Sequence, residues 1–167
     1  AFVNDFLGQV MFVEGQILSL EEAVPADKFS WRPSEGVRSI GETYRHMAFG
    51  NYLLTRTLGT EPPADVNFSM DLKKWDTEVT DKAKISASLK ASIDHLKMAA
   101  GKLTEANLAE MVELFGNKMT KRSLLMSSLS HLHEHLGQSI AYARMNNIVP
   151  PWTAAELAKE AEKAKTK

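Results

Sequence analysis

The chain of 167 residues contains no cysteine. Disulfides, thiolate metal ligands and a cysteine nucleophile are therefore excluded, so a transition metal would have to be held by histidine and carboxylate side chains. No apolar run approaches the roughly 20 residues that a helix needs to span a bilayer. The formal net charge is only −1, and lysine and arginine are scattered along the chain. We therefore expect neither nucleic acid nor a membrane as a partner.

A targeting segment is also missing from the sequence, which starts at Ala1. We expect a cytoplasmic location; an extracytoplasmic one would require a signal peptide before Ala1.

Neither a convincing strand pattern nor an internal repeat is present, and helical periodicity dominates. Apolar residues at spacings of three and four predict four amphipathic helices, over 2–24, 39–58, 81–103 and 120–145. The fold class is therefore all-α, a four-helix bundle. The connection between the second and third helices is longer than a tight turn requires, so it could cross the bundle.

Smaller features complete the expected organisation. Ser39 and Glu42 form the S-x-x-E pattern of a capping box at the start of the second helix. Residues 61–80 are predicted to be mostly loop with a short helical turn, and residues 104–119 to be mixed, with a helical turn or an extended piece. We expect one bundle domain over 1–152 and a short, exposed C-terminal helix over 153–167.

Three of the five histidines lie in the stretch HLHEHLGQ, residues 131–138. Because a helix turns by about 100° per residue, His131 and His135 share one face, whereas His133 points about 200° away from His131. His131 and His135 therefore form a natural metal-chelating pair. A zinc-protease motif is excluded because Gly137 stands where H-E-x-x-H requires its second histidine.

A catalytic metal site commonly takes three protein ligands and leaves one position open. His46, beside the apolar stripe of the second helix, is the best candidate for the third ligand. His95 is less suitable because it lies among lysine and aspartate residues and could be at the surface. Buried histidines can also simply be satisfied by hydrogen bonds. A ferritin-like di-iron site is disfavoured because no histidine has a glutamate three residues before it.

Two segments resemble the DinB-like superfamily of metal-binding four-helix bundles: RSIGETYRHMAFGNYLL at 38–54 and HLHEHLGQSIAYARMNNIVPPW at 131–152. The piece FSWRPSEGVRSI, which precedes the second helix, is also similar to the family. The resemblance implies a bundle with a long crossover between helices 2 and 3 and a divalent metal held by His46, His131 and His135. It also implies that a homodimer is possible.

Characterised members that the chain resembles include bacillithiol and mycothiol S-transferases and a thiol-dependent maleylpyruvate isomerase. The resemblance therefore implies a small-molecule substrate, such as a low-molecular-weight thiol, activated by the metal. Water could be activated in the same way, which would give a hydrolase. The metal is expected to be zinc or nickel, since imidazole ligands suit both.

A non-enzymatic module that binds a metal or a small ligand is the alternative function. It would need a fourth ligand to close the metal site, for which the sequence offers Glu42 and Glu134. No catalytic residue is identified, although Tyr142 could donate a hydrogen bond to a ligand or simply pack in the core. The loops 25–38 and 59–80, with Trp31 and Trp75, are expected to line the pocket or cover the core.

Overall fold

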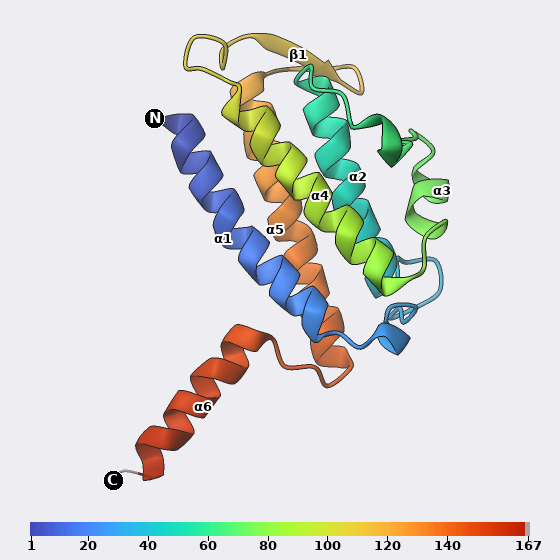
Figure 1. The fold of residues 1–167 in the computed structure, drawn as a ribbon, viewed down its shortest axis with the longest axis vertical. Coiled ribbons are helices and arrows are strands. Elements are labelled where there is room, and N and C mark those ends of the chain that lie inside the picture. Colours follow the sequence, from blue (N-terminus) through green and yellow to red (C-terminus); the bar gives the residue numbers. More distant parts are fainter. Residues whose placement is uncertain (166–167) are drawn as a thin grey trace.

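The computed structural model describes residues 1–165. Four long helices lie side by side and form the bundle (Figure 1). They are α1 (Phe2–Ala23), α2 (Ile40–Thr57), α4 (Lys82–Gly101) and α5 (Lys121–Met145). The remaining elements are short 3₁₀ turns at Ala26–Lys28 and Ala64–Val66, the helices α3 (Leu72–Thr77) and α6 (Pro151–Lys165), and the strands β1 (Met111–Leu114) and β2 (Asn117–Thr120). The all-α bundle is confirmed.

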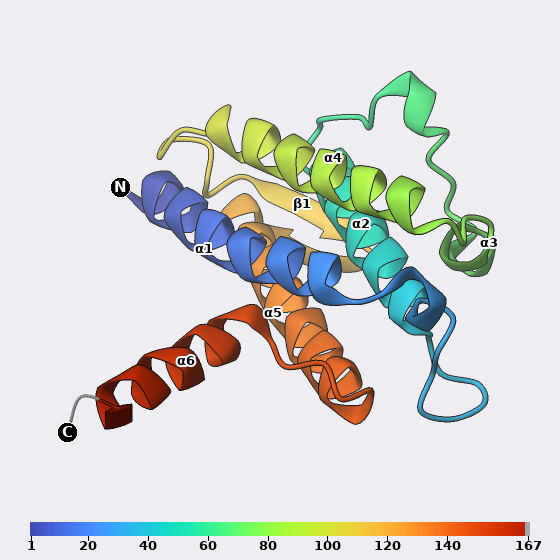
Figure 2. The same cartoon turned by 60° about the horizontal axis from the view of Figure 1, so that its bottom comes forward.

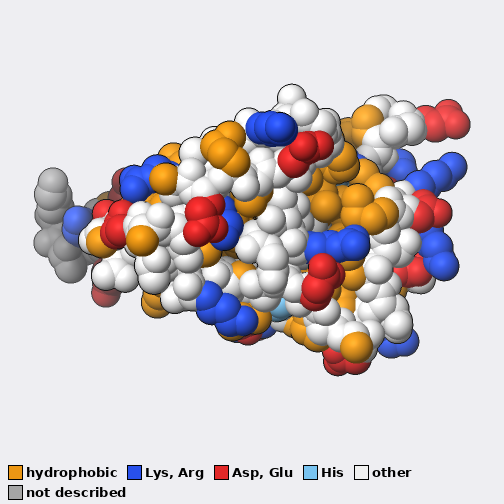
Figure 3. Space-filling model, turned by 90° about the horizontal axis from the view of Figure 1, so that it is seen from above, with side chains coloured by type: hydrophobic (Ala, Val, Ile, Leu, Met, Phe, Trp, Pro, Cys, Tyr) orange, Lys and Arg blue, Asp and Glu red, His pale blue; other side chains and the backbone are white. Residues whose placement is uncertain are grey.

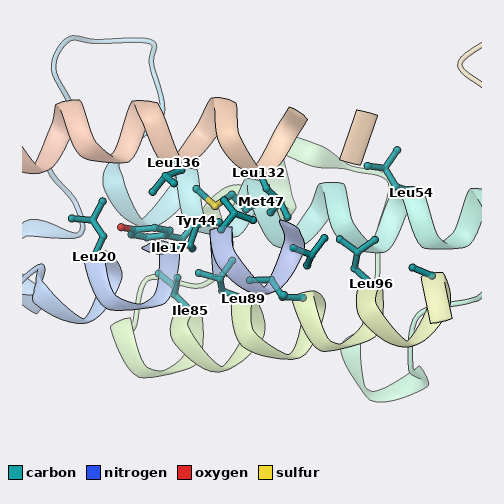
Figure 4. Close-up of a cluster of buried hydrophobic side chains, with 14 of the residues drawn as sticks. Ile17, Leu20, Tyr44, Met47, Leu54, Ile85, Leu89, Leu96, Leu132 and Leu136 are labelled. Carbon is teal, nitrogen blue, oxygen red and sulfur yellow. The ribbon is translucent and has the colours of Figure 1, made fainter. Parts of the chain in front are cut away.

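The hydrophobic core lies between the four long helices, where their apolar stripes meet (Figure 4). Each stripe repeats at three or four residues, so one face of every helix is buried when the helices pack together. The labelled side chains come from all four helices and are Ile17, Leu20, Tyr44, Met47, Leu54, Ile85, Leu89, Leu96, Leu132 and Leu136. This core holds α2 and α5, the two helices that carry the candidate ligands, against each other.

The start of α2 is fixed by the capping box that the sequence predicts. The Ser39 hydroxyl accepts a hydrogen bond from the Glu42 backbone N–H at 3.2 Å, and the Glu42 carboxylate accepts one from the Ser39 N–H at 2.8 Å. Two backbone donors that the helix leaves free are thereby satisfied. The cap fixes where α2 begins, and its Glu42 lies one turn before His46.

The connection between α2 and α4 is anchored by α3. The Trp75 indole N–H donates to the Arg45 carbonyl at 2.8 Å, and the Arg45 guanidinium lies 4.1 Å from the centre of the Trp75 ring. Trp75 is buried in a small second core with three residues of α2. These contacts hold α3 against α2 and place Asp76, the next residue, beside the histidines.

The mixed segment 104–119, for which the sequence left a helical turn or an extended piece open, contributes to a short hairpin. Residues 111–120 form an antiparallel hairpin in which Leu114 is paired with Asn117. Its two-residue loop, Phe115 and Gly116, has positive φ at both positions, 51° and 78°, as in a type I′ turn. Such turns normally use Asn-Gly, and each strand has only four residues, so the pattern is too short to stand out from the sequence.

The last helix, α6, extends away from the bundle (Figures 1 and 2). Apart from its first residues it is exposed, as expected for a helix rich in alanine, glutamate and lysine. The division into domains at residue 152 stays a prediction.

Charged side chains of both signs are interspersed on the face seen in Figure 3. Within residues 1–165, no helix is both long enough and apolar enough to cross a membrane.

Candidate metal centre

The bundle brings His46 of α2 together with His131 and His135 of α5. One ring nitrogen from each of the three lies within 4.8 Å of the other two. The Nε2 atoms of His46 and His131 are 3.3 Å apart, and the ring centres of His131 and His135 are 4.5 Å apart. The two α5 residues are neighbours because of their i, i+4 spacing. Only helix packing brings His46 to them.

The three imidazoles fit a divalent metal such as zinc. With Zn–N bonds of about 2.0–2.1 Å, neighbouring ligand atoms of a tetrahedral site lie roughly 3.3 Å apart. The His46–His131 separation of 3.3 Å matches this spacing. Without a metal, the same contact between two nitrogens could only be a hydrogen bond in which one ring donates to the other. The group could therefore hold a metal ion.

Asp76 is a neighbour of the site that sequence reasoning missed. Its Oδ1 atom lies 3.9 Å from Nδ1 of His46, and both atoms are buried and have no hydrogen-bond partner. The other carboxylate oxygen accepts a hydrogen bond from the Arg38 guanidinium at 2.7 Å. The 3.9 Å separation is too long for a hydrogen bond, but a carboxylate on this side of the ring stands where the outer partner of a ligating histidine is normally found. No local pattern marks Asp76, because α3 is positioned by the packing of Trp75.

Gln138 makes a direct contact with the ring of His135. Its side-chain carbonyl lies 2.8 Å from Nδ1 of His135, and its amide donates to the Tyr142 hydroxyl at 2.9 Å. The ring of Trp31 packs edge-on against Tyr142, with centres 5.5 Å apart. Gln138, Tyr142 and Trp31 therefore form a chain of contacts behind His135. In this chain Trp31 and Tyr142 have a packing role.

His131 lies against the backbone of α2 at Gly50. A Cβ atom added at Gly50 would come within 2.3 Å of Cε1 of the His131 ring, much closer than any non-bonded contact allows. Gly50 is thus required for the ring to occupy its position. The Nδ1 atom of His131 is buried and has no hydrogen-bond partner.

The remaining candidate residues lie elsewhere. His133 and Glu134 are exposed on the outer side of α5. Glu42 is engaged in the cap and pairs with Arg32 at 2.8 Å.

The suggestion that His95 could lie at the surface is wrong, because its side chain is only 6% exposed and packs beside Tyr52. Its helix face, next to Leu96, is covered by α2.

The environment keeps two of the three imidazoles neutral. Burial lowers the pKa of His46 to about 3, and the positive charge of Arg38 acts in the same direction. Burial likewise lowers the pKa of His131 to about 4, with further contributions from His135 and Arg38. A neutral imidazole has a free lone pair, so both rings are ready to bind a metal at neutral pH.

The metal-free protein should lose stability as the pH falls below about 6.5, the pKa of an unperturbed histidine. The unfolded chain takes up protons at His46 and His131 there, whereas the folded chain does so only near pH 3 and 4. Above about pH 6.5 both rings are neutral in the folded and the unfolded chain, and the free energy of unfolding does not depend on them. Between about pH 6.5 and the folded pKa values, the free energy of unfolding falls by at most about 1.4 kcal/mol per pH unit for each ring. Thermal melts of the metal-free protein at about pH 7 and about pH 5 measure it.

The matched variant for this pH effect is the double substitution His46→Gln and His131→Gln, which should reduce the difference between the two melting temperatures. His133→Gln, which removes an exposed imidazole from the same helix, should leave it unchanged. An equal difference in the parent and the double variant would show that these two rings do not cause it.

Two cavities border the site. The larger, about 860 Å³, is lined by residues of the two loops predicted to form the pocket and by Gln138 and Tyr142 of α5. Its charged lining residues are Arg32, Arg38, Glu42, Lys73 and Asp76. The smaller, about 290 Å³, has His46 and His131 in its wall. Trp75 lines neither cavity and is a core residue.

Comparison with protein-family models gives a match to the DinB superfamily over residues 12–139. Among solved structures, a DinB-like protein from Bacillus cereus is similar with a TM-score of 0.73 and 18% identity, covering 87% of this chain and 93% of that one. A DinB-like protein from Bacillus subtilis has a TM-score of 0.66 and 21% identity, covering 86% and 92%. A conserved protein from Enterococcus faecalis has a TM-score of 0.70 and 14% identity, covering 84% and 94%. At these identities the solved structures show the fold alone. No curated protein matches the chain.

Proposed function

Because this chain belongs to the DinB superfamily and gathers three imidazoles around one point, we propose that it is a metal-dependent enzyme that activates a low-molecular-weight thiol for transfer to an electrophilic carbon. The three-histidine group is the observation that carries the proposal. Zinc or nickel is the metal we expect, since both accept imidazole ligands.

When bound, a divalent ion supplies the positive charge that makes a thiol acidic enough to lose its proton at neutral pH. The residues of the chain preserve that charge, because neutral imidazoles do not cancel it. Gln138 contacts Nδ1 of His135 at 2.8 Å and fixes the orientation of that ring, and the Asp76 carboxylate stands 3.9 Å behind His46. The chain has no cysteine, so the sulfur nucleophile would come from the substrate.

The donor set favours chemistry over a purely structural metal. Within residues 1–165, the histidine group includes no fourth histidine or carboxylate. Of the two glutamates that could have closed the shell, Glu42 is held in the helix cap and Glu134 faces outward. A site with three protein ligands keeps a position open for substrate or water, which argues against the non-enzymatic alternative.

The larger cavity suits the hydrophilic body of a small thiol. Arg32, Arg38 and Lys73 bring positive charge to its wall, and Gln138 and Tyr142 bring polar atoms. Arg38 is held in place by its ion pair with Asp76 at 2.7 Å. We infer that the carboxylate of a small thiol would be recognised by these groups, next to Asp76 and Gln138, which neighbour His46 and His135.

A spectroscopic titration tests thiol activation directly. The protein would be loaded with Co²⁺ in place of its metal and titrated with 2-mercaptoethanol, and with ethylene glycol as the matched alcohol. We expect a sulfur-to-cobalt charge-transfer band with the thiol only, and none in His135→Ala. Metal content after gel filtration shows that the thiol has not removed the cobalt. A loaded protein that gives no band with the thiol would contradict thiol activation and leave water as the activated group.

A further inference from the structure

The smaller cavity has a wall of a different character from the larger one. Apart from His46, His131 and Ser127, its lining consists of Gly50 and apolar side chains, with no charged residue. The apolar side chains are Phe49, Leu53, Leu54, Leu72, Leu114 and Phe115. They come from α2, α3 and the hairpin, so the cavity exists only because these three elements converge on the histidines.

The two cavities lie on either side of Leu72. Among residues 1–165, it is the one residue that lines both. On one side of it the wall is charged and contains Asp76 and Gln138, which support the histidines from behind; on the other side, the wall is apolar and contains the rings of His46 and His131 themselves. The surroundings of the site therefore include one polar and one apolar environment.

The size of the apolar cavity limits what it can hold. An apolar cavity of roughly 150 Å³ accommodates benzene, and this one measures about 290 Å³. An aromatic ring with a short alkyl substituent, or an alkyl chain of similar volume, would fill it. Because no charged side chain lines the cavity, a charged group placed there would lose its hydration without compensation.

Phe115 provides an independent indication that this wall serves a ligand. It occupies the first position of the hairpin loop with φ of 51°, a conformation that is unfavourable for a bulky side chain. It is also 73% exposed, so burial in the core does not explain its presence. A strained, exposed aromatic residue beside a reactive centre is typical of a functional position.

We propose that the apolar cavity binds the neutral aryl or alkyl part of the electrophilic substrate, with Phe115 forming its outer wall. This proposal rests on the thiol-transfer function. In that reaction a sulfur–carbon bond forms, the bond from carbon to the leaving group breaks with its electron pair on the leaving group, and the thiol proton passes to solvent. The cavity holds the carbon next to the histidines, and the apolar wall selects hydrophobic electrophiles.

Binding of fluorobenzene to the metal-free protein, followed by fluorine NMR, tests the cavity without requiring activity. The informative variant is Phe115→Asn, because asparagine accepts positive φ and keeps the Asn-Gly type of turn. We expect about tenfold weaker binding, the loss of one apolar contact surface, together with an unchanged or higher melting temperature. Phe12→Asn is the matched control, since Phe12 is 62% exposed on α1 and lines neither cavity.

The outcomes separate the cavity from the metal centre. No binding of fluorobenzene by the parent, or equal binding by the parent and Phe115→Asn, would overturn the apolar-substrate proposal even if the protein takes up metal. Fluorobenzene binding that is weakened by Phe115→Asn but not by Phe12→Asn would support it. The cobalt titration with 2-mercaptoethanol then decides separately whether the thiol-transfer function stands.

Discussion

Alanine at His46, His131 or His135 should abolish metal binding, from about one equivalent per chain in the parent to none in each variant. The three rings supply the complete set of donors in the group, so each variant leaves two imidazoles. Loss of an outer partner of a ligand typically costs about 10–100-fold in metal affinity, and loss of the ligand itself should cost more. Elemental analysis of protein prepared without a histidine tag provides the measurement.

His133→Ala is the matched control for these variants. It removes an imidazole from the same turn of α5, but the side chain is exposed and faces away from the group. Metal content should stay at the parental level. The three-histidine assignment fails if His46→Ala retains its metal, because the remaining pair on α5 would then suffice. A parent that takes up neither zinc nor nickel on reconstitution would remove the basis for the proposed function.

Gly50→Ala should greatly weaken metal binding although glycine supplies no ligand. The new Cβ would lie 2.3 Å from Cε1 and 2.7 Å from Nδ1 of His131, so the ring must leave its position. The imidazole lies at the end of a side chain that can rotate away, and α2 itself gains by about 0.5–1 kcal/mol from replacing glycine in a helix. We therefore expect a folded variant with metal affinity reduced by about 100-fold or more, at or beyond the upper end of the loss typical for an outer partner of a ligand.

Calorimetric metal titration together with a thermal melt of the metal-free variant measures both parts of this expectation. Gly15→Ala, in the middle of α1 with no atom within 4 Å of its added Cβ, is the control. It should bind metal as the parent does. Undiminished metal affinity in Gly50→Ala would mean that His131 can ligate from another position, and that the close approach to α2 is not needed.

Local features were predictable because short-range geometry controls them. The capping box at Ser39 depends on residues three apart, and the pairing of His131 with His135 depends on residues four apart. The rejection of His133 followed from the same helical spacing. Each of these features remains the same however the helices pack.

The errors also have physical causes. The segment 104–119 was left undecided between a helical turn and an extended piece, because the strands of the hairpin are short and its turn contains phenylalanine instead of the favoured asparagine. His95 was judged by its charged neighbours in sequence, but Lys97 pairs with Glu14 of α1 while His95 packs beside Tyr52 of α2. A helix that has neighbours on several sides buries more than its most apolar stripe.

The amino-acid order alone therefore specified the helices, their buried faces and the chelating pair on α5, because a helix repeats every 3.6 residues. The apolar stripe of the second helix made His46 the best candidate for the third ligand and the family resemblance agreed, but only packing brought it within 3.3 Å of His131. Three features arose from contacts between segments far apart in the chain. They are the place of Asp76 behind His46, the close approach of the His131 ring to Gly50, and the apolar cavity that Phe115 helps to line. Such contacts depend on how α2, α3, α5 and the hairpin fit together in space, and no periodicity within one segment encodes that fit.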